Sequence, residues 1–172
     1  MMTRYLPLLA LACLLAAPVT RAQEGAELEY PPYSAQKAVV EFFFNEPAHI
    51  NGALFWLRSL VNPLTAEPYG YSIDELDIKV VIHGTEIVTL ARHNYEKYRD
   101  AVERMRYYAE LGVEFRVCAL SAQDYGYTPR DLQDFVLVVP SAMTEIIHWQ
   151  EQGYGLLEPK ILEKRHTVEE IR

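Results

Sequence analysis

Four apolar runs recur along the chain, and each is bounded by polar or turn-forming residues. Their side chains are mostly β-branched or aromatic and alternate little with polar positions, a pattern typical of strands in a sheet covered on both faces. The predicted strands span residues 37–44, 77–82, 113–120 and 135–139. Residues 154–157 are a candidate fifth strand, which we expect at a sheet edge.

Between these runs, apolar residues recur every three or four positions, which is the period of an amphipathic helix. The first stripe predicts a helix that Asn45 caps, that has Pro47 in its first turn and that ends at Asn62-Pro63. This stripe consists of Ile50, Leu54, Leu57 and Val61. The second predicts a long helix over residues 94–111, whose buried face consists of Tyr98, Ala101, Val102, Met105, Tyr108 and Ala109.

Two shorter helices follow. Residues 128–131 read T-P-R-D, which predicts an N-cap, a proline at the first position and a carboxylate in the first turn. Pro140-Ser141 opens a last helix that we expect to lie in the core and that ends at Gly153. Its predicted core residues are Met143, Ile146 and Ile147.

The alternation of strands and helices predicts one α/β domain over residues 37–157, with a mainly parallel sheet and helices on both faces. Residues 23–36, which contain Pro31-Pro32, form an extended lead-in. Residues 158–172 are charged, and two interpretations stay open: a frayed helix packed on a neighbour, or a solvated tail.

The first 22 residues resemble an export signal. Arg4 precedes the apolar run 6–19, which is shorter than the ~20 residues that a membrane-spanning helix needs. Residues 20–22 form a cleavage site, so Gln23 would begin the mature protein. An uncleaved anchor is the competing interpretation. Cleavage predicts a periplasmic or secreted protein without membrane association.

The charge balance and the missing motifs exclude several classes of ligand. The chain has 16 basic and 24 acidic residues, so it is a poor ligand for phosphate backbones, and we expect no nucleic acid partner. It has no glycine-rich phosphate loop, no Walker lysine motif and no G-x-S-x-G turn. Its five histidines are scattered, without an H-E-x-x-H pair. We therefore expect no metal and no cofactor.

One cysteine remains once the signal is removed. The chain contains two, and Cys13 lies in the signal, which leaves Cys118 as a single thiol without an internal disulfide partner. An odd cysteine in an exported protein indicates inert burial, intermolecular pairing or a reactive role. Cys118 lies near the C-terminal end of the third strand, where open α/β sheets place their ligand sites.

Two other polar residues are expected at the same edge of the sheet. His83 ends the second strand, and an imidazole near a thiol lowers the pKa of the thiol. The alternative for His83 is a turn histidine bonded to a backbone carbonyl. Ser141 follows the fourth strand and either directs a helix N-terminus at the site or acts as a plain N-cap. Arg116 lies within a strand and needs a partner, for which Glu114 is nearby.

Four ordered motifs carry a resemblance to a known family. They are K-V-V-I-H-G at 79–84, L-G-V-E-F-R-V-C-A at 111–119, L-V-V-P-S-A at 137–142 and Q-E-Q-G-Y at 150–154. Together they resemble the DsrE/DsrF-like proteins, and more narrowly the exported single-domain branch. The resemblance implies a three-layer α/β/α domain with a five-stranded sheet that assembles as homotrimers or hexamers. It also implies sulfur relay, in which the cysteine after the third strand carries a persulfide.

Two hypotheses follow for the function. In the first, the protein carries or transfers sulfane sulfur, with Cys118 as the thiolate acceptor, His83 as its activator and Ser141 as an anion-stabilising residue; a thiol or sulfur-donor protein would be the partner. This hypothesis requires that the thiol reaches solvent at the edge of the sheet. In the second, the protein is a non-catalytic oligomeric binding module with a structural cysteine.

Overall fold

A computed structural model describes residues 25–172 of the chain. The predicted signal at residues 1–22, with Cys13, lies outside the described residues. Residues 32–172 belong to one compact unit, and residues 25–31, which belong to a separate unit, contain no helix or strand. No helix within the described part of the chain is both long enough and apolar enough to cross a membrane.

The compact unit is built on a five-stranded sheet in which all neighbouring strands are parallel, in the order β4-β3-β2-β1-β5. The candidate fifth strand is confirmed, and it pairs with β1 at the edge of the sheet. The strands are β1 (Lys37–Phe42), β2 (Asp77–Ile82), β3 (Glu114–Cys118), β4 (Val136–Val139) and β5 (Gly155–Leu157).

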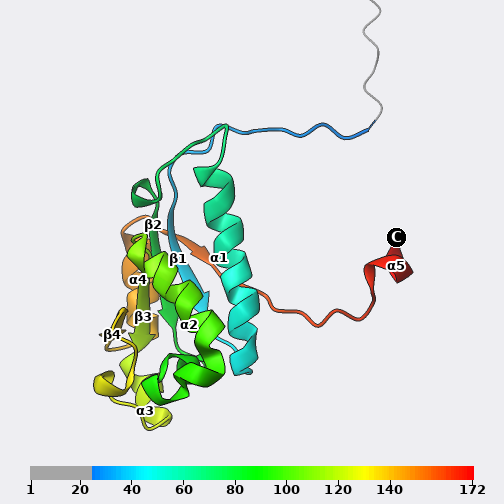
Figure 1. Cartoon of the computed structure of the whole chain (residues 1–172). Coiled ribbons are helices and arrows are strands. Elements are labelled where there is room, and N and C mark those ends of the chain that lie inside the picture. The colour runs from blue at the N-terminus through cyan, green and yellow to red at the C-terminus, as the bar shows by residue number, and fades with distance from the viewer. Residues whose placement is uncertain (1–24) are drawn as a thin grey trace, which may run out of the picture. The chain divides into compact units, whose positions relative to one another are not determined.

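Helices follow the strands in the predicted alternation (Figure 1). The α-helices are α1 (Ile50–Thr65), α2 (Tyr95–Glu110), α3 (Ala119–Asp124), α4 (Ala142–Glu151) and α5 (Val168–Ile171). Short 3-10 turns connect them: η1 (Pro47–His49), η2 (Ile73–Glu75), η3 (Thr85–Leu90), η4 (Arg92–Asn94) and η5 (Pro129–Asp131). The turn η5 has the expected cap, since the Asp131 carboxylate accepts hydrogen bonds from the N–H and the hydroxyl of Thr128.

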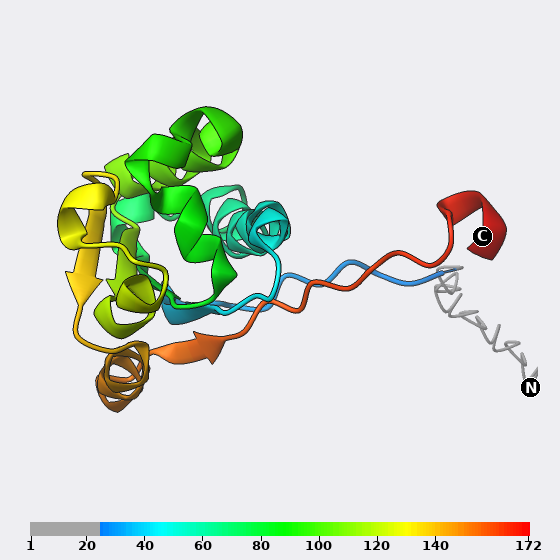
Figure 2. The ribbon, with the colours of Figure 1, turned by 90° about the horizontal axis from the view of Figure 1, so that it is seen from below.

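The sheet lies between two helical layers. Helices α1 and α2 cover one face and α4 covers the other, so the predicted three-layer α/β/α sandwich is confirmed (Figure 2). Side chains alternate between the two faces along each strand. Val80 and Ile82 of β2 therefore pack in the larger core with α1 and α2, whereas Val81 packs beneath α4.

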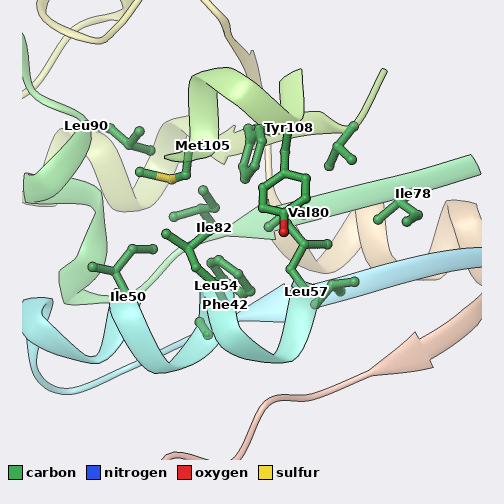
Figure 3. Packing of buried hydrophobic residues seen from close by; sticks show 14 of the residues in the cluster. Phe42, Ile50, Leu54, Leu57, Ile78, Val80, Ile82, Leu90, Met105 and Tyr108 are labelled. Atoms are coloured by element: carbon green, nitrogen blue, oxygen red, sulfur yellow. The ribbon is translucent and has the colours of Figure 1, made fainter. Parts of the chain in front are cut away.

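The larger core is apolar and fully enclosed. Leu54 and Leu57 of α1 and Met105 of α2 point toward Phe42 and Ile82 of the sheet (Figure 3). Each of these five side chains is 0% exposed. Burial of a large aliphatic or aromatic side chain contributes about 1.5–3 kcal/mol. This core fixes β1, β2 and β3 beside each other and so determines where their C-terminal ends meet.

The first helix differs from its prediction at both ends. Asn45 does not cap it: the residue before η1 is Glu46, which makes no side-chain cap. The helix also continues through Pro63 to Thr65. Pro63 lies in the last turn, where a missing N–H leaves only one carbonyl unpaired, and Leu64 extends the buried stripe by another position. Burial of that leucine favours continuation of the helix.

Two further expectations need correction. Met143 and Ile147 do not lie in the core, since they are 51% and 57% exposed on the outer side of α4, and only Ile146 of the three is buried. The charged C-terminal segment is not solvated throughout: Pro159 is buried and Ile161 packs on the larger core, with its Cδ1 atom against Gly52. Beyond Ile161 the residues are exposed.

Candidate functional site

Cys118 is the last residue of β3 and the residue that precedes α3. Its side chain lies on the sheet face that α4 covers, in a small cluster with Val39, Val81, Ala142 and Ile146. The residue is 4% exposed and its thiol is free. The expectation that the thiol reaches solvent is therefore wrong, because the first turns of the helices that follow β3 and β4 close over it.

Hydrogen-bond donors surround the sulfur on the side of these helices. Burial raises the pKa of the Cys118 thiol, but hydrogen bonds from the Ser121 hydroxyl and from the N–H groups of Ser121, Ala142 and Leu120 outweigh it. The pKa of the thiol therefore lies below its ordinary value. Donors to a sulfur stabilise its anionic form, and the thiolate is the nucleophile in cysteine chemistry.

Ser141 is the residue that caps α4, and its own side chain makes no capping hydrogen bond. Its carbonyl oxygen accepts a hydrogen bond from the Thr144 hydroxyl at 2.9 Å. The contact with the sulfur comes from the next residue, through the backbone N–H of Ala142. The N-terminus of α4 is thus directed at Cys118, and its first helical residue makes the contact.

His83 follows directly after β2, whose last residue Ile82 pairs with Val117. The pairing of the two parallel strands ends there, and the next residues along the chain are His83 after β2 and Cys118 at the end of β3. The His83 ring nitrogen Nε2 lies 2.8 Å from the Glu41 carboxylate, and the ring stacks on Phe43 with 4.5 Å between centroids. Among the described residues, the hydrogen bond and ion pair of His83 are with Glu41, and none joins His83 to Cys118.

Glu86 is a residue of this region that the sequence analysis missed. Its side chain is 0% exposed, and its carboxylate accepts hydrogen bonds from the N–H of Gly84 at 2.8 Å and of Phe44 at 3.1 Å. Burial raises the pKa of Glu86 to about 7, although these N–H groups favour the anion. A glutamate in a turn carries no pattern that distinguishes it from a solvated one.

In the sequence, Gly84 is the residue that could have indicated a buried group such as Glu86 nearby. A Cβ atom at Gly84 would lie 2.5 Å from both the Glu86 carboxylate and the Phe44 nitrogen. The backbone of Gly84 has an ordinary extended conformation, so close approach and not chain geometry requires glycine. A glycine directly after a buried strand can indicate such an approach.

A shallow groove of about 630 Å³ opens beside His83. Phe43, Gly84 and Tyr125 line it, together with residues 159–162 of the C-terminal segment. Cys118 is not among the described residues that line this groove. Within the described part of the chain, no three His, Cys, Asp or Glu side chains are placed to hold a metal ion.

Arg116 has the partner that the sequence analysis expected, and a second one. Its guanidinium group lies 2.5 Å from Glu114 of the same strand and 2.6 Å from Glu145 of α4. Desolvation lowers the pKa of Arg116, but the two carboxylates raise it by more. Lys79 of β2 lies 2.6 Å from Glu114, so the ion pairs continue across the sheet.

Comparisons with known proteins agree with this fold. The model of the DsrE/DsrF-like family matches residues 28–159. The chain is also similar to a solved structure described as a protein of unknown function, MTH1491, from Methanobacterium thermoautotrophicum. That match has 20% sequence identity and a TM-score of 0.58, and it covers 72% of this chain and 99% of the other. At this identity the likeness shows a shared fold. A search of curated proteins gives no match.

Proposed function

The chain belongs to the DsrE/DsrF-like family, and from this premise we propose that it carries sulfane sulfur as a persulfide on Cys118. Membership suggests a role in sulfur relay in general. One observation supports the finer proposal: the sulfur lies at the end of a central strand among hydrogen-bond donors that lower its pKa. Such an arrangement raises the thiolate fraction at neutral pH.

The transfer step needs no external oxidant. The Cys118 thiolate attacks the outer sulfur of a donor persulfide, R–S–SH, and forms a new S–S bond. The donor's own S–S bond breaks, and the electron pair leaves with the donor as R–S⁻. The product is Cys118–S–SH, so one sulfur atom moves and the pair of molecules undergoes no net oxidation.

Three groups have roles in this proposal. The N–H of Ala142, in the helix that Ser141 caps, stabilises the thiolate before attack and the persulfide anion afterwards. The Ser121 hydroxyl supplies a second donor. His83, one strand away, is the candidate activator, and its orientation is held by Glu41 and Phe43.

The low exposure of Cys118 supports a second candidate, a non-catalytic oligomeric binding module with a structural cysteine. At 4% exposed, the thiol resembles a small buried apolar residue. The two candidates differ in one respect: a carrier must admit a donor's outer sulfur to Cys118, whereas a structural thiol stays closed.

We also propose the setting in which the carrier acts. The N-terminal signal pattern supports export to the periplasm or beyond, with a thiol or sulfur-donor protein as partner. The exposed apolar side chains of α4, Met143 and Ile147, support assembly into a homotrimer or hexamer.

Sulfur loading tests the proposal directly. In the full chain with Cys13→Ser, Cys118 is the sole cysteine. We expect incubation with glutathione persulfide to add the mass of one sulfur atom to the intact protein, and a thiol reductant to remove it. The matched variant Cys13→Ser/Cys118→Ser controls for sulfur bound elsewhere.

Two results would reject the carrier. One is an unchanged mass after incubation; the other is an equal gain in the variant without Cys118. An unchanged mass together with negligible alkylation by iodoacetamide in the folded protein would support the structural cysteine.

A further inference from the structure

Helix α4 packs mainly over β1 and β2, and two of its residues also meet the neighbouring strand β3, at two successive levels. At the C-terminal end of the strand, Ala142 packs in one buried cluster with Cys118, and its N–H is one of the donors that lower the pKa of the Cys118 thiol. Two residues earlier on β3, the Nε atom of Arg116 donates to the Glu145 carboxylate at 2.6 Å. Arg116 and Cys118 share a strand face, and Ala142 and Glu145 are one helical turn apart, so the two contacts are stacked.

The Glu145 carboxylate accepts two hydrogen bonds, one from β3 and one from its own helix. The Trp149 indole N–H donates to the same carboxylate at 2.9 Å. The Arg116 guanidinium also lies over the Trp149 ring, 5.3 Å from its centroid. The side chains of Arg116 and Glu145 are 16% and 15% exposed, so this pair is shielded from water and weakly screened by salt.

Apolar contacts hold α4 over β1 and β2, where Ala142 and Ile146 pack with Val39 and Val81. Ala142 and Ile146 are its buried apolar residues, whereas Met143 and Ile147 point outward. The alanine has only one methyl group to pack. Toward β3, the helix is joined by the contacts that Arg116 makes with Glu145 and Trp149, and these contacts bear on the position of the helix start relative to that strand.

We propose that Glu145, through its ion pair with Arg116, is a positioning residue that holds the first turn of α4 against β3 and so keeps the Ala142 N–H on the Cys118 sulfur. This inference rests on the proposed function, because it concerns how the carrier thiol is prepared. It adds two residues to the site that do not touch the sulfur.

The negative charge of Glu145 and its positioning contact have opposite effects on the thiol pKa, so the measured shift distinguishes a direct effect of charge from a positioning role. Glu145 is an anion, so removing its charge alone would stabilise a nearby thiolate and lower the thiol pKa. Loss of a positioning contact withdraws an N–H donor from the sulfur and raises the thiol pKa. The direction of the shift in a Glu145 variant thus identifies its role.

The test measures the pH dependence of Cys118 alkylation by iodoacetamide in the full chain with Cys13→Ser. We expect Glu145→Ala to raise the thiol pKa and to slow alkylation about three- to tenfold at neutral pH, since one pKa unit is a tenfold change in thiolate below the pKa. Glu145→Gln keeps an oxygen that accepts from both Arg116 and Trp149, so we expect it to restore most of the rate.

Glu114→Ala is the matched control. Glu114 also pairs with Arg116, at 2.5 Å, but it belongs to β3 itself and makes no contact with α4 among the described hydrogen bonds and ion pairs. We expect the Cys118 thiol to have the same pKa in the Glu114→Ala variant as in the Cys13→Ser protein. Near-UV circular dichroism of each variant establishes that the fold is retained. Should Glu145→Ala fail to fold, the Arg116→Lys variant takes its place. Lysine keeps the positive charge but loses the forked geometry of the guanidinium group, so we expect the same rise in the thiol pKa.

Three results would overturn the inference: a lower or unchanged thiol pKa in Glu145→Ala, an equal shift in Glu145→Gln, or an equal shift in Glu114→Ala. The readout is independent of sulfur loading. If Cys118 takes up no sulfur but its pKa still depends on Glu145, the proposed function fails and the positioning role stands.

Discussion

The reactivity of Cys118 depends on atoms within hydrogen-bond distance of its sulfur. Burial alone would raise the pKa of the thiol and make it inert, and the donors from Ser121, Ala142 and Leu120 reverse that effect. A hydrogen bond of this kind is directional and short-ranged. Loss of one donor should therefore change the reactivity more than loss of a polar group on the next strand.

Alkylation rates test that ranking. We expect Ser121→Ala to slow iodoacetamide alkylation of Cys118 at neutral pH, because the Ser121 hydroxyl is the donor that lowers the pKa of the thiol most. His83→Ala should also slow it severalfold if the imidazole activates the thiol, but by less than Ser121→Ala. An unchanged rate in His83→Ala would remove His83 from the site.

Glu86 is a second residue whose surroundings change its titration. Its folded-state pKa of about 7 exceeds the ordinary value of 4.5, so the folded protein binds this proton more tightly than the unfolded chain. Glu86 therefore contributes stability that is fully present below pH 4.5 and is lost as the pH rises to about 7. This dependence on pH is opposite to that of a carboxylate in an ion pair, whose contribution to stability is lost as the pH falls.

Comparison with Glu86→Gln isolates this contribution. We expect the free energy of unfolding of the wild type, relative to the variant, to fall by about 3 kcal/mol between about pH 4.5 and pH 8. Urea unfolding across this range measures it. The other carboxylates are present in both proteins, so their contributions to the pH dependence cancel in this difference. A difference that stays constant with pH would show that Glu86 titrates normally.

Secondary-structure elements determine which of these residues meet. The parallel register of β2 and β3 brings the residues after Ile82 and Val117 to one edge of the sheet. Helix α4 starts at that edge, and the N–H of its first residue is among the donors that lower the pKa of the Cys118 thiol. The ion pair between Arg116 and Glu145 couples the strand to the helix, so a change in either element should appear as a change at Cys118.

At the scale of the whole molecule, the side of the fold that α4 covers carries a group of exposed apolar side chains. Met143 and Ile147 lie one turn apart on the outer side of α4. Leu137, 49% exposed, belongs to the edge strand β4 and pairs in register with Arg116, so it faces the same side of the sheet. A surface of this kind supports the proposed contact between copies of the chain.

Light scattering tests that assembly. We expect the wild type to have the molar mass of a trimer or hexamer, and the double variant Met143→Lys/Ile147→Lys to have that of a single chain, since burying two charges at an interface is unfavourable. Phe55→Lys is the control, because Phe55 is an equally exposed residue of α1, in the opposite layer. A monomeric wild type, or dissociation by the control alone, would contradict the prediction.

Periodicity in the sequence was sufficient for most of the fold. Nearly unbroken apolar runs predicted the strands, and the period of 3.6 predicted α2 nearly to the residue. The alternation of strands and helices predicted helices on both faces of the sheet, and the family resemblance implied the same three layers. Periodicity failed for α4, where Met143 and Ile147 appear as core residues: an apolar stripe shows that a face will be covered, but not whether this chain or another one covers it.

The sequence by itself determined the elements, their order and the placement of Cys118 and His83 at one edge of the sheet, because local periodicity and parallel connection fix which strand ends lie together. Only the tertiary structure decided how those residues are surrounded. Contacts between elements far apart in the chain closed the thiol from solvent, brought the Ala142 N–H to it, joined Arg116 to Glu145 and buried Glu86. Such contacts depend on how side chains fill a shared volume, which no single segment specifies.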